Sequence, residues 1–130
     1  SGGILVADRY TTSNAVHQAS KLPEGERQAF LKWLFDFEYR LLQLPEPTLV
    51  FYLDVPTEIT EKMMRCREAQ TNTTADIHEQ DDGYLRACRR AAQKTAEECA
   101  WHCIDCSQNG EMRNAGDIHE EIYRCVRELL

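Results

Sequence analysis

The sequence lacks any hydrophobic run long enough to form a membrane-spanning helix. Such a helix needs roughly 20 consecutive apolar residues, whereas the longest apolar runs of this chain have the length of a β-strand. A signal peptide is also missing, because the first residues contain neither a basic segment nor a long apolar one. These absences predict a cytoplasmic protein that has no membrane as a partner.

The sequence has no excess of basic residues either. Its 130 residues include 15 lysines and arginines against 22 aspartates and glutamates, which gives a net charge of −7. Surfaces that bind nucleic acids usually carry an excess of positive charge, so this composition argues against a nucleic-acid partner. It does not exclude a small phosphorylated ligand, which needs only a few cations close to its phosphate.

Six cysteines are present, but the sequence lacks the second pair of ligands that a zinc site would need. Cys103 and Cys106, with His102 beside them, have the spacing of metal ligands. The surrounding segment favours a short strand instead, in which positions 103 and 106 point to opposite faces. We therefore expect reduced thiols that pack as small apolar groups, without zinc and without a disulfide framework.

Three short apolar segments, Ile4–Ala7, Leu49–Val55 and Trp101–Cys106, have the pattern of buried strands. Each is apolar along almost its whole length rather than alternating, which is typical of a parallel sheet covered on both faces. Helical patterns lie between and after these segments. Strands that alternate with helices predict an α/β domain with a parallel sheet.

Four helices are predicted from apolar residues that recur every three or four positions. Their expected ranges are about 24–44, 57–68, 84–99 and 118–129. Pro45 and Pro47 end the first of them. The polar stretch 70–75 has the composition of an exposed loop.

The tetrad Asp-Ile-His-Glu occurs twice, at 76–79 and 117–120. The two copies could supply metal ligands only if their loops converged, and an adjacent His and Glu are a weak signal. An Asp N-cap followed three positions later by Glu is a capping-box arrangement. We therefore interpret both copies as helix starts.

The predicted sheet is small for its class. Sheets usually have about five or six strands, and only three are predicted here. The phosphate loop G-x-x-x-x-G-K-[ST], which normally follows the first strand of nucleotide-binding folds, is absent, and the first residue is not Met. We expect the chain to be the C-terminal part of a larger α/β fold.

Asp8 and Arg9 come directly after the first predicted strand. In open parallel sheets, ligands bind at the carboxyl ends of the strands. An Arg at such an end can donate two hydrogen bonds to a phosphate, and a neighbouring carboxylate can hold a magnesium-bound water or orient the Arg. An ordinary surface ion pair explains the same two residues, so the residues alone leave both interpretations open.

Four polar residues follow closely: Ser13, Asn14, His17 and Gln18. Positions 14, 17 and 18 share one face of a helix. The amides of Asn and Gln carry both the donor and the acceptor that recognition of a base edge requires. A solvated first turn with Ser13 or Asn14 as the N-cap is the alternative, and taken alone these residues favour it.

The stretch DRYTTSNAVHQ, residues 8–18, resembles the signature of the thymidylate kinase family. Three further stretches resemble later parts of that family in the same order. LPEPTLVFYLDVP (44–56) resembles its proline-led strand, and EKMMRCREAQTNTTADIHEQDDGYL (61–85) its LID and the next helix. WHCIDCSQNG (101–110) resembles its last strand and adenine-side loop.

This resemblance covers nearly the whole chain and implies a three-layer, P-loop nucleoside-monophosphate-kinase-like fold. Residues 1–130 would be the C-terminal part of a single kinase domain that lacks the N-terminal phosphate-loop segment. A LID-like loop would span about residues 65–80. Many members of the family carry an aromatic residue where this chain has His17.

The resemblance implies that the first motif binds the nucleotide that accepts the phosphoryl group. Arg9 would bind the phosphate of thymidylate, and Asp8 would help to place magnesium near the phosphates. Gln18 would hydrogen-bond the edge of thymine. Ser13 and Asn14 would lie close to the nucleoside.

The same resemblance implies further roles elsewhere in the chain. Tyr10 would support the site, and a packing role explains it equally well. Arg65 and Arg67 fall where LID arginines of bacterial-type enzymes approach the transferring phosphoryl group, and a solvated helix end is their alternative. Ser107 and Gln108 would lie near the adenine of ATP.

The resemblance therefore implies a nucleotide-biosynthesis enzyme that phosphorylates dTMP to dTDP with ATP as co-substrate and Mg²⁺ as cofactor. It also implies a homodimer, to which the long apolar helix over residues 24–44 could contribute. The chain alone is expected to have little activity, because the missing N-terminal segment is needed to complete the fold. Another deoxynucleotide or nucleoside kinase, or a non-catalytic nucleotide-binding or assembly module of the same fold, is the alternative.

Overall fold

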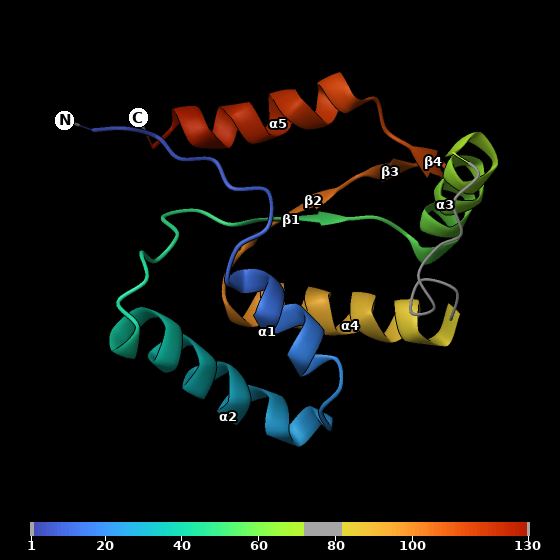
Figure 1. Cartoon of the computed structure of the whole chain (residues 1–130). Coiled ribbons are helices and arrows are strands. Elements are labelled where there is room, and N and C mark those ends of the chain that lie inside the picture. Colours follow the sequence, from blue (N-terminus) through green and yellow to red (C-terminus); the bar gives the residue numbers. More distant parts are fainter. Residues whose placement is uncertain (1, 72–81, 130) are drawn as a thin grey trace. The chain divides into compact units, whose positions relative to one another are not determined.

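The computed structural model describes residues 2–71 and 82–129. The chain divides into two compact units, an N-terminal unit of Ser1–Thr48 and a C-terminal unit of Leu49–Leu130. Helices α1 and α2 belong to the first unit, and β1 to α5 belong to the second (Figure 1). Most of the structure is helical and the C-terminal unit contains a small parallel sheet, so the expected α/β class is confirmed at this coarse level.

The N-terminal unit is built on two helices that pack on each other. Helix α1 spans Thr12–Ala19, and helix α2 spans Glu24–Phe35. The connection between them is short and ends in Pro23, whose fixed backbone angle suits the residue before a helix. The buried apolar side chains of these helices are Ala15, Ala19, Leu31 and Leu34.

The chain continues from α2 directly into η1, a π-helical segment over Asp36–Leu41. The rings of Trp33 and Phe37 stack across the junction, with centroids 5.5 Å apart and planes inclined by 10°. The helix predicted over about 24–44 is thus confirmed as far as Leu41, where η1 ends, and its last part is a π-helix rather than an α-helix. Such π segments frequently mark functional positions in helices.

The segment Ile4–Ala7 does not form the buried strand that its composition predicts. Ile4 is 66% exposed and Leu5 is 93% exposed. An extended segment becomes a strand only when a neighbouring strand takes its backbone hydrogen bonds. The described part of the N-terminal unit contains no strand, so the prediction from composition alone is wrong.

The N-cap position of helix α1 lies two residues before Ser13 and three before Asn14, the two expected alternatives. The residue before the helix is Thr11, and its side chain makes no capping hydrogen bond. Instead, the backbone N–H of Ser13 donates to the Tyr10 carbonyl at 2.9 Å, and that of Asn14 donates to the Thr11 carbonyl at 2.9 Å. Ser13 and Asn14 are therefore inside the helix, and neither is its N-cap.

The described residues of the C-terminal unit form seven elements along the chain. They are β1 (Phe51–Asp54), α3 (Thr57–Thr71), α4 (Asp82–Glu98), β2 (His102–Asp105), β3 (Ser107–Gln108), β4 (Glu111–Met112) and α5 (Ala115–Arg127). β1 and β2 pair in parallel, which confirms two of the three predicted strands with shorter bounds. The register places Asp54 opposite Asp105 at the carboxyl ends of the two strands.

Helix α4 lies against β1 and β2 and presents small side chains at its buried positions. Ala91, Ala92 and Ala96 are almost fully buried. Thr95 is buried as well, and its hydroxyl donates to the Ala91 carbonyl at 2.8 Å, which satisfies the polar group inside the core. Small residues allow the helix backbone to approach the sheet closely.

Strands β3 and β4 form a hairpin that the sequence interpretation did not include. Its turn residues, Asn109 and Gly110, have φ angles of 54° and 77°. Two successive positive φ angles are the requirement of a type I′ turn, for which Asn-Gly is the preferred pair. The dipeptide at 109–110 was therefore an available signal for this hairpin.

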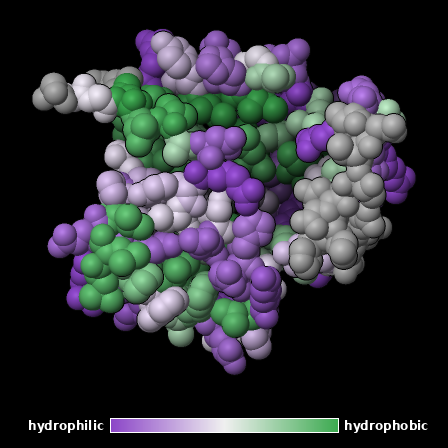
Figure 2. All heavy atoms as spheres, viewed as in Figure 1, coloured by the Kyte–Doolittle hydropathy of each residue, from purple (hydrophilic) through white to green (hydrophobic). Residues whose placement is uncertain are grey.

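The N-cap of helix α5 lies three residues before the expected one. Asn114 is the N-cap, and its side chain accepts a hydrogen bond from the Gly116 N–H at 2.7 Å. The interpretation of Asp117 as the cap is therefore wrong, and the first tetrad, 76–79, lies outside the described residues. No residue of α5 is fully buried. Figure 2 shows hydrophobic side chains at the molecular surface, and Tyr123 and Leu129 of the C-terminal unit are about half exposed.

The six cysteines are free thiols in the structure. Cys106 is buried, whereas Cys66 and Cys103 are exposed, so packing as buried apolar groups does not describe them all. Within the described ranges, no group of three or more His, Cys, Asp or Glu residues could hold a metal ion. Within the same ranges, no helix has the length and apolar character needed to cross a membrane.

Candidate functional site

The turn that leads into α1 holds Arg9 in an unusual backbone conformation. Its φ angle is 67°, in the left-handed region that non-glycine residues seldom adopt. This conformation costs roughly 1–2 kcal/mol for an L-residue, so other contacts must hold it. The next residue supplies one of them, because the Tyr10 hydroxyl donates to the Pro45 carbonyl at 3.1 Å.

The guanidinium of Arg9 reaches across to α1 and contacts His17. Arg9 Nη2 lies 2.8 Å from His17 Nε2. Since a guanidinium is always protonated, Arg9 donates and the unprotonated Nε2 of a neutral imidazole accepts. Partial desolvation lowers the pKa of His17, and the positive charges of Arg9 and Lys21 lower it further, which favours the neutral imidazole that this hydrogen bond requires.

The opposite end of α1 is fixed to η1 by side-chain hydrogen bonds. Asn14 Nδ2 donates to Glu38 Oε1 at 3.1 Å, and the hydroxyls of Thr11 and Tyr39 lie 2.9 Å apart. Glu38 is only 4% exposed, and its second oxygen, Oε2, has no hydrogen-bond partner among the described residues. A buried carboxylate therefore sets the position of Asn14.

The residues expected to bind the accepting nucleotide all belong to the N-terminal unit. Arg9, Asn14 and Gln18 lie on the turn and on α1, with Gln18 exposed one helical turn beyond Asn14. Ser13 is half-buried in the first turn of the helix, and Asp8 is exposed beside Arg9. The sequence interpretation did not include Glu38, because an acidic residue within an apolar helical stripe carries no signal of its own.

A second polar group lies at the carboxyl end of β1 in the C-terminal unit. Arg89 of α4 donates to both carboxylate oxygens of Asp54, from Nε at 2.8 Å and from Nη2 at 2.9 Å. Gln93 Nε2 donates to Asp54 Oδ2 at 2.9 Å, and the Tyr52 hydroxyl lies 3.5 Å from Oδ1. These hydrogen bonds, with that of Arg89 the strongest, hold the pKa of Asp54 below its ordinary value.

Burial and the neighbouring Asp54 carboxylate act on Tyr52 in the opposite direction and raise its pKa to about 12. The sequence interpretation did not single out Asp54, Arg89 or Gln93. The carboxyl-end rule that drew attention to Asp8 applies equally to Asp54, and applying it to every predicted strand could have found this group.

The end of β2 leads into the hairpin that carries Ser107 and Gln108. The backbone N–H and the hydroxyl of Ser107 both lie 2.8 Å from Asp105 Oδ1, and these bonds lower the pKa of Asp105. Ser107 is therefore engaged in fixing the turn, whereas Gln108 is exposed. Of the two residues expected near adenine, Gln108 is the one whose side chain reaches solvent.

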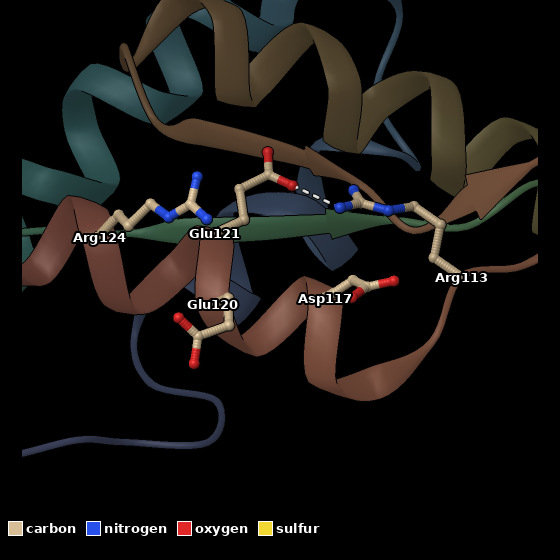
Figure 3. A pocket seen from close by; sticks show the side chains of 5 residues that line it. All are labelled: Arg113, Asp117, Glu120, Glu121 and Arg124. Atoms are coloured by element: carbon tan, nitrogen blue, oxygen red, sulfur yellow. Dashed lines mark hydrogen bonds and ion pairs between the residues drawn. The ribbon is translucent and has the colours of Figure 1, made fainter.

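A pocket beside α5 is lined by Arg113, Asp117, Glu120, Glu121 and Arg124. Arg113 and Glu121 point toward each other and form an ion pair of 2.8 Å, while Asp117 and Glu120 point elsewhere (Figure 3). Arg113 also donates to the Asp105 carbonyl. The three carboxylates outnumber the two guanidinium groups. The ion pair connects the residue before α5 to α5 itself, and the bond of Arg113 to the Asp105 carbonyl connects that residue to the end of β2, so the pocket is structural in character.

Arg65 and Arg67 lie on α3, and both are exposed. Helix α3 extends to Thr71, three residues beyond its expected end. The first part of the expected LID-like loop, residues 65–71, is therefore helical, and positions 72–80 lie outside the described residues. Of the expected site residues, those from Asp8 to Gln18 belong to the N-terminal unit, and Arg65, Arg67, Ser107 and Gln108 belong to the C-terminal unit.

A comparison with protein-family models, curated proteins and solved structures found no significant match.

Proposed function

We propose that the chain is the nucleotide-binding part of a thymidylate kinase-like phosphotransferase, which transfers a phosphoryl group from ATP to dTMP. The observation that carries this proposal is the left-handed Arg9 at the entrance to α1, the helix that also carries Asn14 and Gln18. Strained backbone conformations cluster at active sites and ligand-binding positions. The motif of residues 8–18, which resembles the thymidylate kinase signature, supplies the choice of substrate.

In this proposal, Arg9 binds the phosphate of dTMP through paired hydrogen bonds and aligns it for transfer. Gln18 hydrogen-bonds the base. Asn14 donates its amide hydrogen to Glu38 and keeps its carbonyl oxygen for the nucleoside, with Ser13 beside it. Tyr10 supports the turn through its bond to Pro45.

Mg²⁺ fits the donor chemistry of this turn, because it is often held by one or two carboxylates together with substrate phosphates. Asp8 is an exposed carboxylate directly before Arg9, and it would hold the ion, through water, beside the phosphates. The bound ion would neutralise charge on the phosphate oxygens.

The C-terminal unit would meet ATP. Gln108 and Ser107 would lie near adenine, and Arg65 and Arg67 would meet the charge that develops on the transferred phosphoryl group. We further propose that another segment pairs with the apolar residues 4–6, whose exposure leaves backbone and side chains uncovered, and that the 130-residue chain alone turns over little dTMP.

The test is nucleotide binding by the chain, measured by NMR titration with dTMP, dUMP, dCMP and thymidine. We expect dTMP to shift the resonances of Arg9 and Gln18, and thymidine to bind at least about tenfold more weakly because it lacks the phosphate. Arg9→Ala should reduce the affinity for dTMP to that for thymidine. Arg40→Ala is the matched control, because Arg40 is an exposed arginine in the same unit and pairs with Asp36 one helical turn away.

Equal affinities for dTMP and thymidine would show that Arg9 does not bind the phosphate, and this would contradict the proposal. Preference for another monophosphate would favour a different nucleotide kinase. In a protein that also contains the phosphate loop, Arg9→Ala should lower kcat/KM for dTMP by about tenfold or more.

A further inference from the structure

The contact between Arg9 and His17 changes its chemical character when the imidazole gains a proton. In the structure, Arg9 Nη2 is the donor and His17 Nε2 the acceptor, at 2.8 Å. A proton on Nε2 turns His17 into a second donor. Two cationic donors at this distance repel each other unless an anionic acceptor lies between them.

We propose that Arg9 and His17 form a proton-linked dianion site, in which binding of a phosphate monoester is accompanied by uptake of one proton on His17 Nε2. The proton comes from solvent, and both side chains then donate to oxygens of the same phosphate. This inference rests on the proposed function, because it takes the phosphate of a nucleotide as the natural ligand of Arg9.

Two features of the structure support this site. Arg9 keeps a left-handed backbone conformation, and its side chain contacts His17 of α1. His17 lies three residues after Asn14, on the face of α1 that also carries Gln18, so a phosphate between Arg9 and His17 would lie beside the residues proposed to bind the nucleoside.

The charges around His17 favour the neutral imidazole when no anion is bound. Partial desolvation lowers its pKa most, and the positive charges of Arg9 from the preceding turn and of Lys21 after α1 lower it further. From η1, Glu38 meets α1 through Asn14, and Asp8 precedes Arg9 in the chain. A bound dianion favours the protonated imidazole of His17, because its two negative charges offset the positive charges of Arg9 and Lys21.

The experiment uses sulfate as the probe, because sulfate keeps its double negative charge over the pH range in which phosphate monoesters titrate. Binding to the chain is measured by NMR at pH 5.5 and pH 7.5, with the imidazole resonances of His17 as the reporter. We expect the affinity for sulfate to be at least about threefold higher at pH 5.5. Saturating sulfate should also raise the pH at which His17 titrates.

His17→Gln is the decisive variant, because glutamine keeps an acceptor for Arg9 but cannot gain a proton. It should bind sulfate with the same affinity at both pH values. The other three histidines, His78, His102 and His119, remain in this variant, so a pH dependence that persists comes from another group and overturns the proposal. Arg9→Ala should remove binding at both pH values, and circular dichroism of both variants checks that the helices are intact.

The outcomes separate this inference from the proposed function. Proton-linked sulfate binding with no preference for dTMP over thymidine would support the dianion site and contradict a nucleotide substrate. Binding of dTMP through Arg9 with a His17 titration that sulfate and dTMP leave unchanged would support the proposed function and refute the proton link. A chain that binds no sulfate at either pH also refutes it.

Discussion

The ion pair between Arg89 and Asp54 offers the sharpest test of the packing in the C-terminal unit. Arg89 makes two charge-assisted hydrogen bonds to the Asp54 carboxylate, at 2.8 and 2.9 Å. The Asp54 side chain is 17% exposed and that of Arg89 is 31% exposed. The substitution Arg89→Ala therefore leaves a largely buried carboxylate without its cation.

The cost of this substitution follows from the burial. Removing one partner of a buried ion pair costs about 3–5 kcal/mol, while a hydrogen bond to a charged group contributes about 1.5–3 kcal/mol. Gln93 and Tyr52 remain to solvate Asp54, and Arg89 is partly open to water. We therefore expect Arg89→Ala to lower the free energy of unfolding by about 2–3 kcal/mol.

Arg86→Ala is the matched control. Arg86 lies on the same helix and pairs with Glu58 at 3.3 Å, but both side chains are more than half exposed, at 56% and 66%. Surface ion pairs contribute only about 0–1 kcal/mol, so this variant should be close to the unsubstituted protein.

Urea unfolding followed by tryptophan fluorescence measures both variants. A Trp33→Phe background leaves Trp101, which precedes β2, as the reporter of the C-terminal unit. If Arg89→Ala and Arg86→Ala destabilise equally, the Asp54 pair contributes no more than a surface contact and the reasoning is refuted.

The same pair predicts the direction of the acid dependence. Because the pKa of Asp54 is lowered in the folded state, its contribution is present above the ordinary carboxyl value of about 4 and is lost as the pH falls through the folded value. The stability difference between the unsubstituted protein and Arg89→Ala should therefore shrink below about pH 4. A difference that is constant down to pH 2 would contradict the assignment to Asp54.

Two further predictions concern single side chains. Tyr52 should ionise with a pKa of about 12, because burial and Asp54 both disfavour its anion. In an ultraviolet titration of the tyrosines, Tyr52→Phe should remove the ionisation that occurs at the highest pH. Loss of an ionisation at lower pH would contradict the burial of Tyr52. Asn114→Ala should lower the free energy of unfolding by about 1 kcal/mol through loss of the cap of α5, whereas Asp117→Ala should lower it less. Hydrogen exchange of the amides in the first turn of α5 compares the two variants. Equal protection of these amides in both variants would refute Asn114 as the cap.

The sequence predicted those elements whose partners lie within the same unit. Leu49–Val55 and Trp101–Cys106 both form strands because each supplies the other's hydrogen bonds. Ile4–Ala7 has the same apolar composition and does not, since the described part of its unit offers no strand to pair with. Composition measures how much a segment gains from burial, whereas strand formation also depends on a neighbour that a one-dimensional pattern does not specify.

The capping errors have a related physical cause. Asp-Ile-His-Glu and Asn-Ala-Gly both contain a residue able to cap α5, and a local pattern cannot rank two caps three residues apart. The structure selects Asn114, and Arg113 directly before it is anchored by Glu121 and by the Asp105 carbonyl. The start of α5 therefore depends on the position of Arg113, which follows the β3–β4 hairpin.

Site residues were predictable to the extent that their chemistry depends on neighbours in the chain. Arg9, Asn14 and Gln18 could be grouped because a turn followed by one helix carries them all. Asp54 needs Arg89 and Gln93, which lie 35 and 39 positions later on another element, and Asn14 needs Glu38, 24 positions later. Spacing along one helix can identify which side chains share a face. Only the fold shows which buried carboxylate accepts hydrogen bonds at both of its oxygens. Glu38 does not, because its Oε2 has no hydrogen-bond partner among the described residues.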